Sequence, residues 1–149
     1  MFKKKQRIAI IVLIPMLLFT FIITIKTKSY STNPVNIIHE YYEYKNQKKI
    51  NEISKLLYNK NELDNIKLQL SYLSEIDIVS IREYNNPSLL NLYLKSNDNL
   101  KSDDIKIYKV IYTASYSSQE SYKNGEYESW CFLIKEDSSS NWLLDPYDN

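Results

Sequence analysis

The chain has 149 residues, enough for one domain with a core of its own but not for two. All 18 acidic residues lie after Lys28 with 13 of the 19 basic ones, so this part carries a net charge of about −5. A negative surface repels phosphate backbones, so we expect no nucleic-acid partner. One cysteine excludes an intrachain disulfide and one histidine excludes a multi-histidine metal site, so we predict neither a metal nor another cofactor.

The first feature along the chain is residues 8–25, a run of eighteen residues without a charge. As a helix it would be about 27 Å long, close to the hydrocarbon thickness of a bilayer. Four basic residues precede the run and two follow it closely. By the positive-inside rule this predicts a cytoplasmic tail at residues 1–7, a single transmembrane helix in the cell membrane, and a C-terminal domain outside.

A cleaved secretory signal is the alternative interpretation of this run. Such signals have an apolar region of about 7–15 residues that ends at a small-x-small site. The nearest candidate, Ser29-Tyr30-Ser31, follows two lysines that a cleavage site would not normally carry. A bacterial lipoprotein anchor is excluded as well, because it needs a cysteine directly after the apolar run and the next cysteine is the distant Cys131. We therefore predict a retained signal-anchor helix at 8–25, a linker at 26–33 and an extracytoplasmic domain at 34–149.

The domain begins with helical patterns. Asn33-Pro34 is a good helix start, with Asn as the N-cap and Pro in the first helical position, and apolar residues then cover one face up to Tyr44. A second helix begins near Lys48 and ends at residues 59–61, so the two helices should pack as a hairpin. Residues 63–73 fit a short helix and a strand equally well.

The later segments carry strand signals. Residues 76–81, 105–116, 127–135 and 142–144 are rich in β-branched and aromatic side chains. Residues 119–125, with the only glycine, predict a hairpin loop, and 85–104 predict a long loop with one short apolar element that folds back onto the core. Helices followed by strands predict an α+β domain in which a curved antiparallel sheet of about four strands wraps the first helix.

Strand alternation gives an expectation for the third predicted strand. It sends Trp130, Phe132 and Ile134 to one face of the sheet, which we expect to pack on the helices. Trp130 is then part of the core or the wall of a pocket. Its apolar neighbours favour the core, where truncation to alanine would cost about 3–5 kcal/mol.

The C-terminal half also resembles a known family. The segments are Ile-Tyr-Lys-Val-Ile-Tyr at 107–112, Gly125-Glu126-Tyr127, Trp-Cys-Phe-Leu-Ile-Lys-Glu at 130–136 and Trp-Leu-Leu-Asp at 142–145. Together with the helical start and Glu-Tyr-Tyr-Glu-Tyr-Lys-Asn at 40–46, they resemble a domain of unknown function in anchored or exported proteins of low-GC Gram-positive bacteria. That family is similar in fold to the nuclear transport factor 2-like (cystatin-like) superfamily. The resemblance covers about residues 34–149 and implies a cone-shaped domain with a pocket between sheet and helix, but no known activity.

Five residues are candidates for lining this pocket. They are His39, Tyr42, Tyr112, Trp130 and Trp142. His39 falls at the edge of the apolar face of the first helix, where a boundary histidine bonded to water or a carboxylate is favoured over a catalytic base. We therefore predict no catalytic residue, and Tyr112 is the tyrosine that would join His39 in proton transfer if there were one.

Three classes of function fit these features. The first, which we favour, is a non-catalytic membrane-anchored domain that binds a small ligand or a protein partner. The second is a structural subunit of an envelope assembly, because scaffold subunits of conjugative and type IV secretion channels have a similar layout. The third is a small pocket enzyme using His39, because this fold hosts isomerases and dehydratases. Fold analogy alone supports all three classes.

Overall fold

The computed structural model describes residues 33–118, 122–136 and 141–148. No helix within these ranges is both long and apolar enough to cross a membrane. The predicted tail at 1–7, the predicted span at 8–25 and all but the last residue of the linker at 26–33 lie outside the described residues.

Three helices come first: the two that the apolar patterns predict, and a third from the segment that they left undecided. Helix α2 (Pro34–Asn46) is capped by Asn33, whose side chain accepts a 3.0 Å hydrogen bond from the Val35 N–H. Helices α3 (Ile50–Leu56) and α4 (Leu63–Tyr72) follow. The ambiguous segment is thus a helix: Ile66 and Leu70, four residues apart, are buried, whereas Leu68 is 54% exposed.

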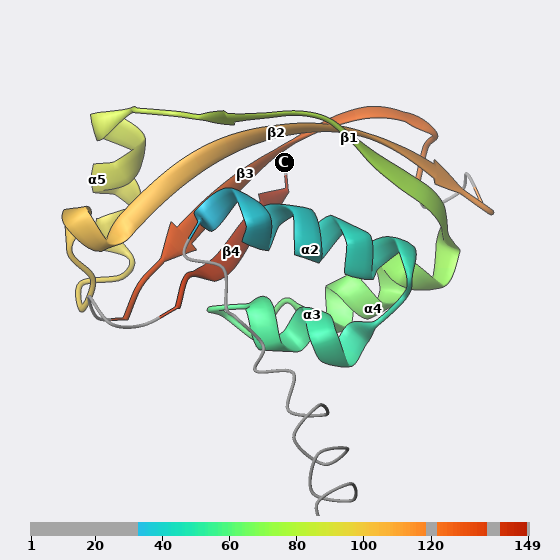
Figure 1. The fold of residues 1–149 in the computed structure, drawn as a ribbon, viewed down its shortest axis with the longest axis horizontal. Coiled ribbons are helices and arrows are strands. Elements are labelled where there is room, and N and C mark those ends of the chain that lie inside the picture. Colours follow the sequence, from blue (N-terminus) through green and yellow to red (C-terminus); the bar gives the residue numbers. More distant parts are fainter. Residues whose placement is uncertain (1–32, 119–121, 137–140, 149) are drawn as a thin grey trace, which may run out of the picture. The chain divides into compact units, whose positions relative to one another are not determined.

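The four predicted strands form one antiparallel sheet in the order β1-β2-β3-β4. Their bounds are β1 (Leu73–Glu83), β2 (Ile105–Tyr116), β3 (Gly125–Ile134) and β4 (Leu143–Asp148). Figure 1 shows β1 and β2 arching over α2, which confirms a curved sheet around the first helix. Gly125 opens β3 with a φ of 149°, a conformation that side chains rarely adopt, and pairs with Ala114 on β2.

The segment predicted as a long loop contains a helix. Helix α5 (Pro87–Lys95) begins at Asn86, whose side chain accepts hydrogen bonds of 3.0 Å from the N–H groups of Ser88 and Leu89. A short 3-10 turn, η1 (Ser102–Asp104), leads into β2. The Asn-Pro pair at 86–87 repeats the start signal of α2, so the short apolar element is a capped helix of 9 residues.

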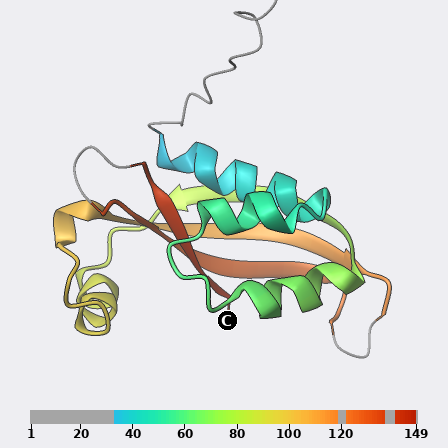
Figure 2. The ribbon, with the colours of Figure 1, turned by 90° about the horizontal axis from the view of Figure 1, so that it is seen from below.

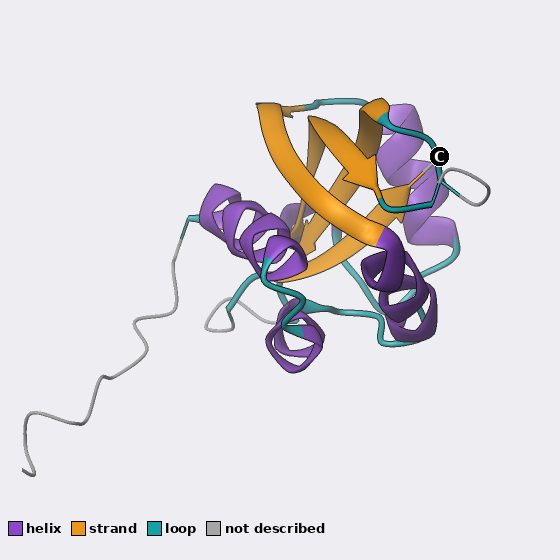
Figure 3. Cartoon of the chain, turned by 90° about the vertical axis from the view of Figure 1, so that its right-hand side faces the viewer, coloured by secondary structure: helices purple, strands orange, loops and turns teal. Residues whose placement is uncertain are grey.

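Hydrophobic clusters cover both faces of the sheet. The larger one lies between α2–α4 and the inner face, where it includes Val110, Cys131 and Leu133. The smaller one packs α5 against the outer face at four buried residues, Ile105, Ile107, Phe132 and Ile134. Figure 3 shows helices on both sides of the sheet. The predicted alternation along β3 is therefore correct, but its assignment to the early helices is wrong, because Trp130, Phe132 and Ile134 face α5.

A side-chain amide fixes α2 on the edge of the sheet. Asn46, the last residue of α2, donates from Nδ2 to the Ile76 carbonyl at 2.5 Å and accepts from the Ile76 N–H at 2.8 Å. β1 is an edge strand, and its pairing with β2 shifts register between Leu73 and Glu75. The amide thus satisfies backbone groups of the edge strand as a neighbouring strand would.

Candidate binding site at the edge strand

Two hollows lie on either side of the short edge strand β4. The C-terminal end of β4 lies between α5 and α4 in two perpendicular views (Figures 1 and 2). The apolar groove, beside α5, has a volume of about 520 Å³ and is lined by Leu89, Leu92, Tyr93, Ser96, Asn97, Trp130, Phe132 and Tyr147. The polar cavity, beside α4, has a volume of about 450 Å³ and is lined by Tyr41, Asn59, Glu62, Asn65, Ile66, Gln69, Tyr122, Asp145, Pro146 and Tyr147.

Aromatic rings form the walls of the apolar groove. Phe132 is buried, and the Tyr93 ring stacks on it with centroids 4.0 Å apart and planes at 10°. Trp130 is partly exposed, and its ring lies 4.5 Å from that of Tyr84. Leu92 is 63% exposed at the groove. The interpretation of Trp130 as a core residue is therefore wrong, since Trp130 lies at the edge of the cluster under α5 and lines the groove.

A short hydrogen bond joins the walls of the two hollows. The Tyr93 hydroxyl on α5 donates to Asp145 Oδ2 on β4 at 2.6 Å. Burial raises the pKa of Tyr93, and the hydrogen bond to the Asp145 carboxylate and its charge raise it further, so the phenol stays protonated. Burial also raises the pKa of Asp145; the bond from Tyr93 opposes this rise, whereas the charge of Glu62 adds to it.

The polar cavity is built mainly by α4 and the loop before it. That loop is held to β4 because Tyr58 donates its N–H to the Leu144 carbonyl at 2.8 Å, next to a parallel bridge between Leu57 and Leu144. Asn65 and Gln69 on α4 follow the N-cap residue Glu62 at helical spacing, so the three side chains lie along one side of the helix start. These three side chains and Asp145 therefore face one cavity although they are far apart in the sequence.

The structure does not bring the five sequence-predicted residues together. Trp130 lines the apolar groove, whereas His39 is exposed on α2 and lines neither hollow. Tyr42 and Tyr112 are buried in the main core with ring centroids 5.1 Å apart. Trp142 is also buried, under the Lys135 ammonium, which lies 4.9 Å from its ring centroid. The predicted pocket residues are thus mostly core residues.

Sequence reasoning missed a lysine in that core. Lys45 is 1% exposed, and its Nζ lies 5.3, 5.6 and 5.9 Å from the ring centroids of Tyr41, Tyr42 and Tyr112. The spacing in the sequence carried the signal, because Lys45 follows Tyr41 and Tyr42 by one helical turn. Tyr42 and Tyr112 therefore surround a buried ammonium group.

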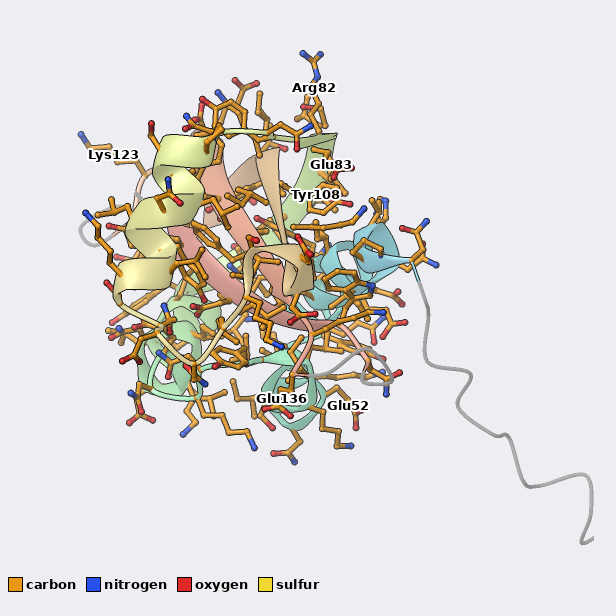
Figure 4. The ribbon with its side chains drawn as sticks, turned by 90° about the vertical axis from the view of Figure 1, so that its left-hand side faces the viewer. Glu52, Arg82, Glu83, Tyr108, Lys123 and Glu136 are labelled. Atoms are coloured by element: carbon orange, nitrogen blue, oxygen red, sulfur yellow. The ribbon has the colours of Figure 1, made fainter. Side chains whose placement is uncertain are left out.

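The far end of β1 carries charge at the surface. Figure 4 shows Arg82 pointing away from the domain and Glu83 beside Tyr108, its partner in the β1–β2 register. Burial raises the pKa of Tyr108, and the charge of Glu83 raises it further. Among the side chains that the structure describes, no three of His, Cys, Asp or Glu gather as a metal site would need.

A family model of a domain of unknown function, DUF4829, matches residues 35–147. The chain belongs to this family. No curated protein and no solved structure matches the chain. The match confirms a domain of unknown function over nearly the range of the resemblance. The membrane anchor, the bacterial group and the nuclear transport factor 2-like fold stay predictions.

The two neighbouring aromatic residues of β3 should differ in their contribution to stability. Phe132→Ala removes a ring that is 3% exposed and should lower the free energy of unfolding by about 3–5 kcal/mol. Trp130→Ala should cost only about 1–2 kcal/mol, because part of that ring already contacts solvent. Urea unfolding followed by circular dichroism measures both variants. Equal losses would show that Trp130 is a core residue.

The raised pKa of Asp145 predicts a pH dependence of stability. A carboxyl whose pKa is higher in the folded state binds its proton more tightly there, so its contribution to stability falls as pH rises through its folded pKa. Asp145→Asn removes this titration and keeps an oxygen that accepts from Tyr93. We expect the variant to gain stability relative to the wild type from acid to neutral pH in urea titrations. Asp98→Asn, at an exposed carboxylate, is the control, and a gain that shrinks with rising pH would contradict the assignment.

Proposed function

We propose that this chain is a non-catalytic binding domain, held at the outer face of the cell membrane by residues 8–25. In this proposal the apolar groove takes a small ligand or a segment of a partner protein. The observation that carries it is the partly exposed Trp130 beside the stacked rings of Phe132 and Tyr93. Ligand sites are concave and mostly apolar with a few polar groups, and Ser96 and Asn97 provide such groups here.

We also propose a nuclear transport factor 2-like fold in an exported protein of a low-GC Gram-positive bacterium. The packing of α2–α4 against a curved antiparallel sheet supports the fold, and so does a hollow beside the sheet. The abundance of Ile, Lys, Asn and Tyr supports the source, because these residues have A/T-rich codons. Both statements go beyond the family match.

The two other classes of function receive less support from the geometry. His39, the base that a pocket enzyme would use, is exposed and lines neither hollow, and Tyr112 is buried in the main core. A role in an envelope assembly stays a hypothesis based on layout alone. Binding at the groove is therefore the function to test first.

The topology can be tested with a single cysteine in the full chain. Ser31→Cys should react with a membrane-impermeant thiol reagent on intact cells, because residue 31 follows the proposed span, and Cys131 is buried and should give little background. Gln6→Cys is the matched control and should react only after the cells are permeabilised. A shortened form of the protein in the medium would refute the anchor.

The groove can be tested by site-specific photo-cross-linking in the same cells. A photoreactive amino acid at Leu92, 63% exposed in the groove, should give discrete adducts, which Trp130→Ala should weaken. Leu68 is the matched control, since it is 54% exposed on α4 and lines neither hollow. Adducts analysed by gel shift and mass spectrometry should appear at 92 alone. The same products at both positions, or none at 92, would argue against binding in the groove.

A further inference from the structure

The polar cavity brings together two carboxylates that have uncharged partners. Glu62 is the N-cap residue of α4, directly before the helix, and Asp145 lies on β4. Glu62 accepts a hydrogen bond from Asn65 Nδ2 at 3.0 Å, and Asp145 accepts one from the Tyr93 hydroxyl at 2.6 Å. Neither forms an ion pair with a lysine, arginine or histidine that the structure describes. Within the described part of the protein, neither carboxylate of the cavity is thus held in a direct ion pair.

The amides on α4 add acceptor atoms to the same cavity. The Asn65 amide nitrogen donates to Glu62, and the Gln69 amide nitrogen donates to the Tyr116 hydroxyl at 3.2 Å. Their amide oxygens accept no hydrogen bond from the residues described. Each amide keeps one further N–H, but the carboxylates contribute acceptors only. A ligand that matches this cavity must therefore be rich in donors.

Tyrosine rings complete the wall. Tyr41, Tyr122 and Tyr147 line the cavity, and Tyr122 is held in place by the Tyr116 ring, whose centroid is 4.9 Å away. The face of an aromatic ring attracts cations, most strongly where water is partly excluded. The Tyr41 ring already lies 5.3 Å from the Lys45 ammonium, so Tyr122 and Tyr147 are the rings that add this attraction for a ligand in the cavity.

We propose that the polar cavity binds a small organic cation that carries primary ammonium groups. Ammonium groups supply donors only, which matches the acceptors of Glu62, Asp145 and the two amide oxygens. The volume of about 450 Å³ suits a small molecule. The net charge of about −5 after Lys28 draws cations toward the domain. The cavity shares Tyr147 with the apolar groove, but this proposal does not rest on the function proposed for the groove.

Isothermal titration calorimetry with the full-length protein in detergent tests the proposal, with spermidine as the probe. We expect saturable binding at about 0.15 M salt, where weak surface attraction is largely screened. Glu62→Gln and Asp145→Asn each remove a charge with almost no change in shape. Each should raise the Kd for spermidine at least tenfold, and a tenfold change corresponds to about 1.4 kcal/mol of binding free energy. Asp98→Asn, outside the cavity, makes the same change in net charge and should leave binding unchanged.

Several outcomes would overturn the proposal. The absence of saturable binding would do so, and so would equal weakening by Asp98→Asn, which would indicate attraction to net charge alone. Glucose and calcium chloride are titrated in parallel, and preferential binding of either would assign the cavity to neutral polyols or to inorganic cations. Circular dichroism checks that each variant is folded. Glu62 lies at the surface-accessible start of α4, so Glu62→Gln keeps the test decisive if Asp145→Asn alters the fold.

Discussion

The burial of the C-terminal half of β3 on both of its faces is the constraint on which this domain depends. Cys131 and Leu133 pack under α2–α4, so Phe132 and Ile134 need a second cover on the outer face, which α5 provides. A helix of 9 residues is about 14 Å long, whereas a strand of 10 residues is about 33 Å long. One short helix cannot cover the whole strand. The apolar groove therefore opens where α5 no longer covers β3, and Trp130 lies at that boundary.

The hydrogen bond between Tyr93 and Asp145 explains how a carboxylate on β4 can lie beside the hydrophobic cluster under α5. Removing a carboxylate from water costs several kcal/mol unless donors replace the water, and the tyrosine hydroxyl is such a donor. Asp145 faces the polar cavity, and a carboxyl group beside a cavity whose pKa is raised by burial is a candidate for a functional role.

The sequence predicted the order and type of most elements, because the periods of 3.6 and 2 in apolar residues depend only on neighbours along the chain. It predicted the faces of β3 correctly, but alternation does not say which helix covers which face. The Asn-Pro pair at 86–87 is the same helix-start signal as Asn33-Pro34, but the polar residues around it favour a loop, so α5 was not predicted. The candidate site was less predictable. Tyr42, Tyr112 and Trp142 are aromatic like the groove residues, and only packing distinguishes a core ring from an exposed one. Glu62 and Gln69 belong to the polar face of a helix, which by itself resembles any solvated surface.

The two hollows are connected by shared groups, and this connection has a thermodynamic consequence if both are binding sites. Tyr147 lines both of them, and Asp145 in the polar cavity is bonded to Tyr93 in the wall of the apolar groove. A cation beside Asp145 favours its ionised form, which is the better acceptor for the Tyr93 hydroxyl. A stronger bond holds α5 more firmly against β4 and so fixes one wall of the groove. Because linkage between sites is reciprocal, a ligand that needs this arrangement of the groove must strengthen cation binding by the same factor. The edge strand β4, which carries Asp145 and Tyr147, is thus the element through which the two sites would influence each other.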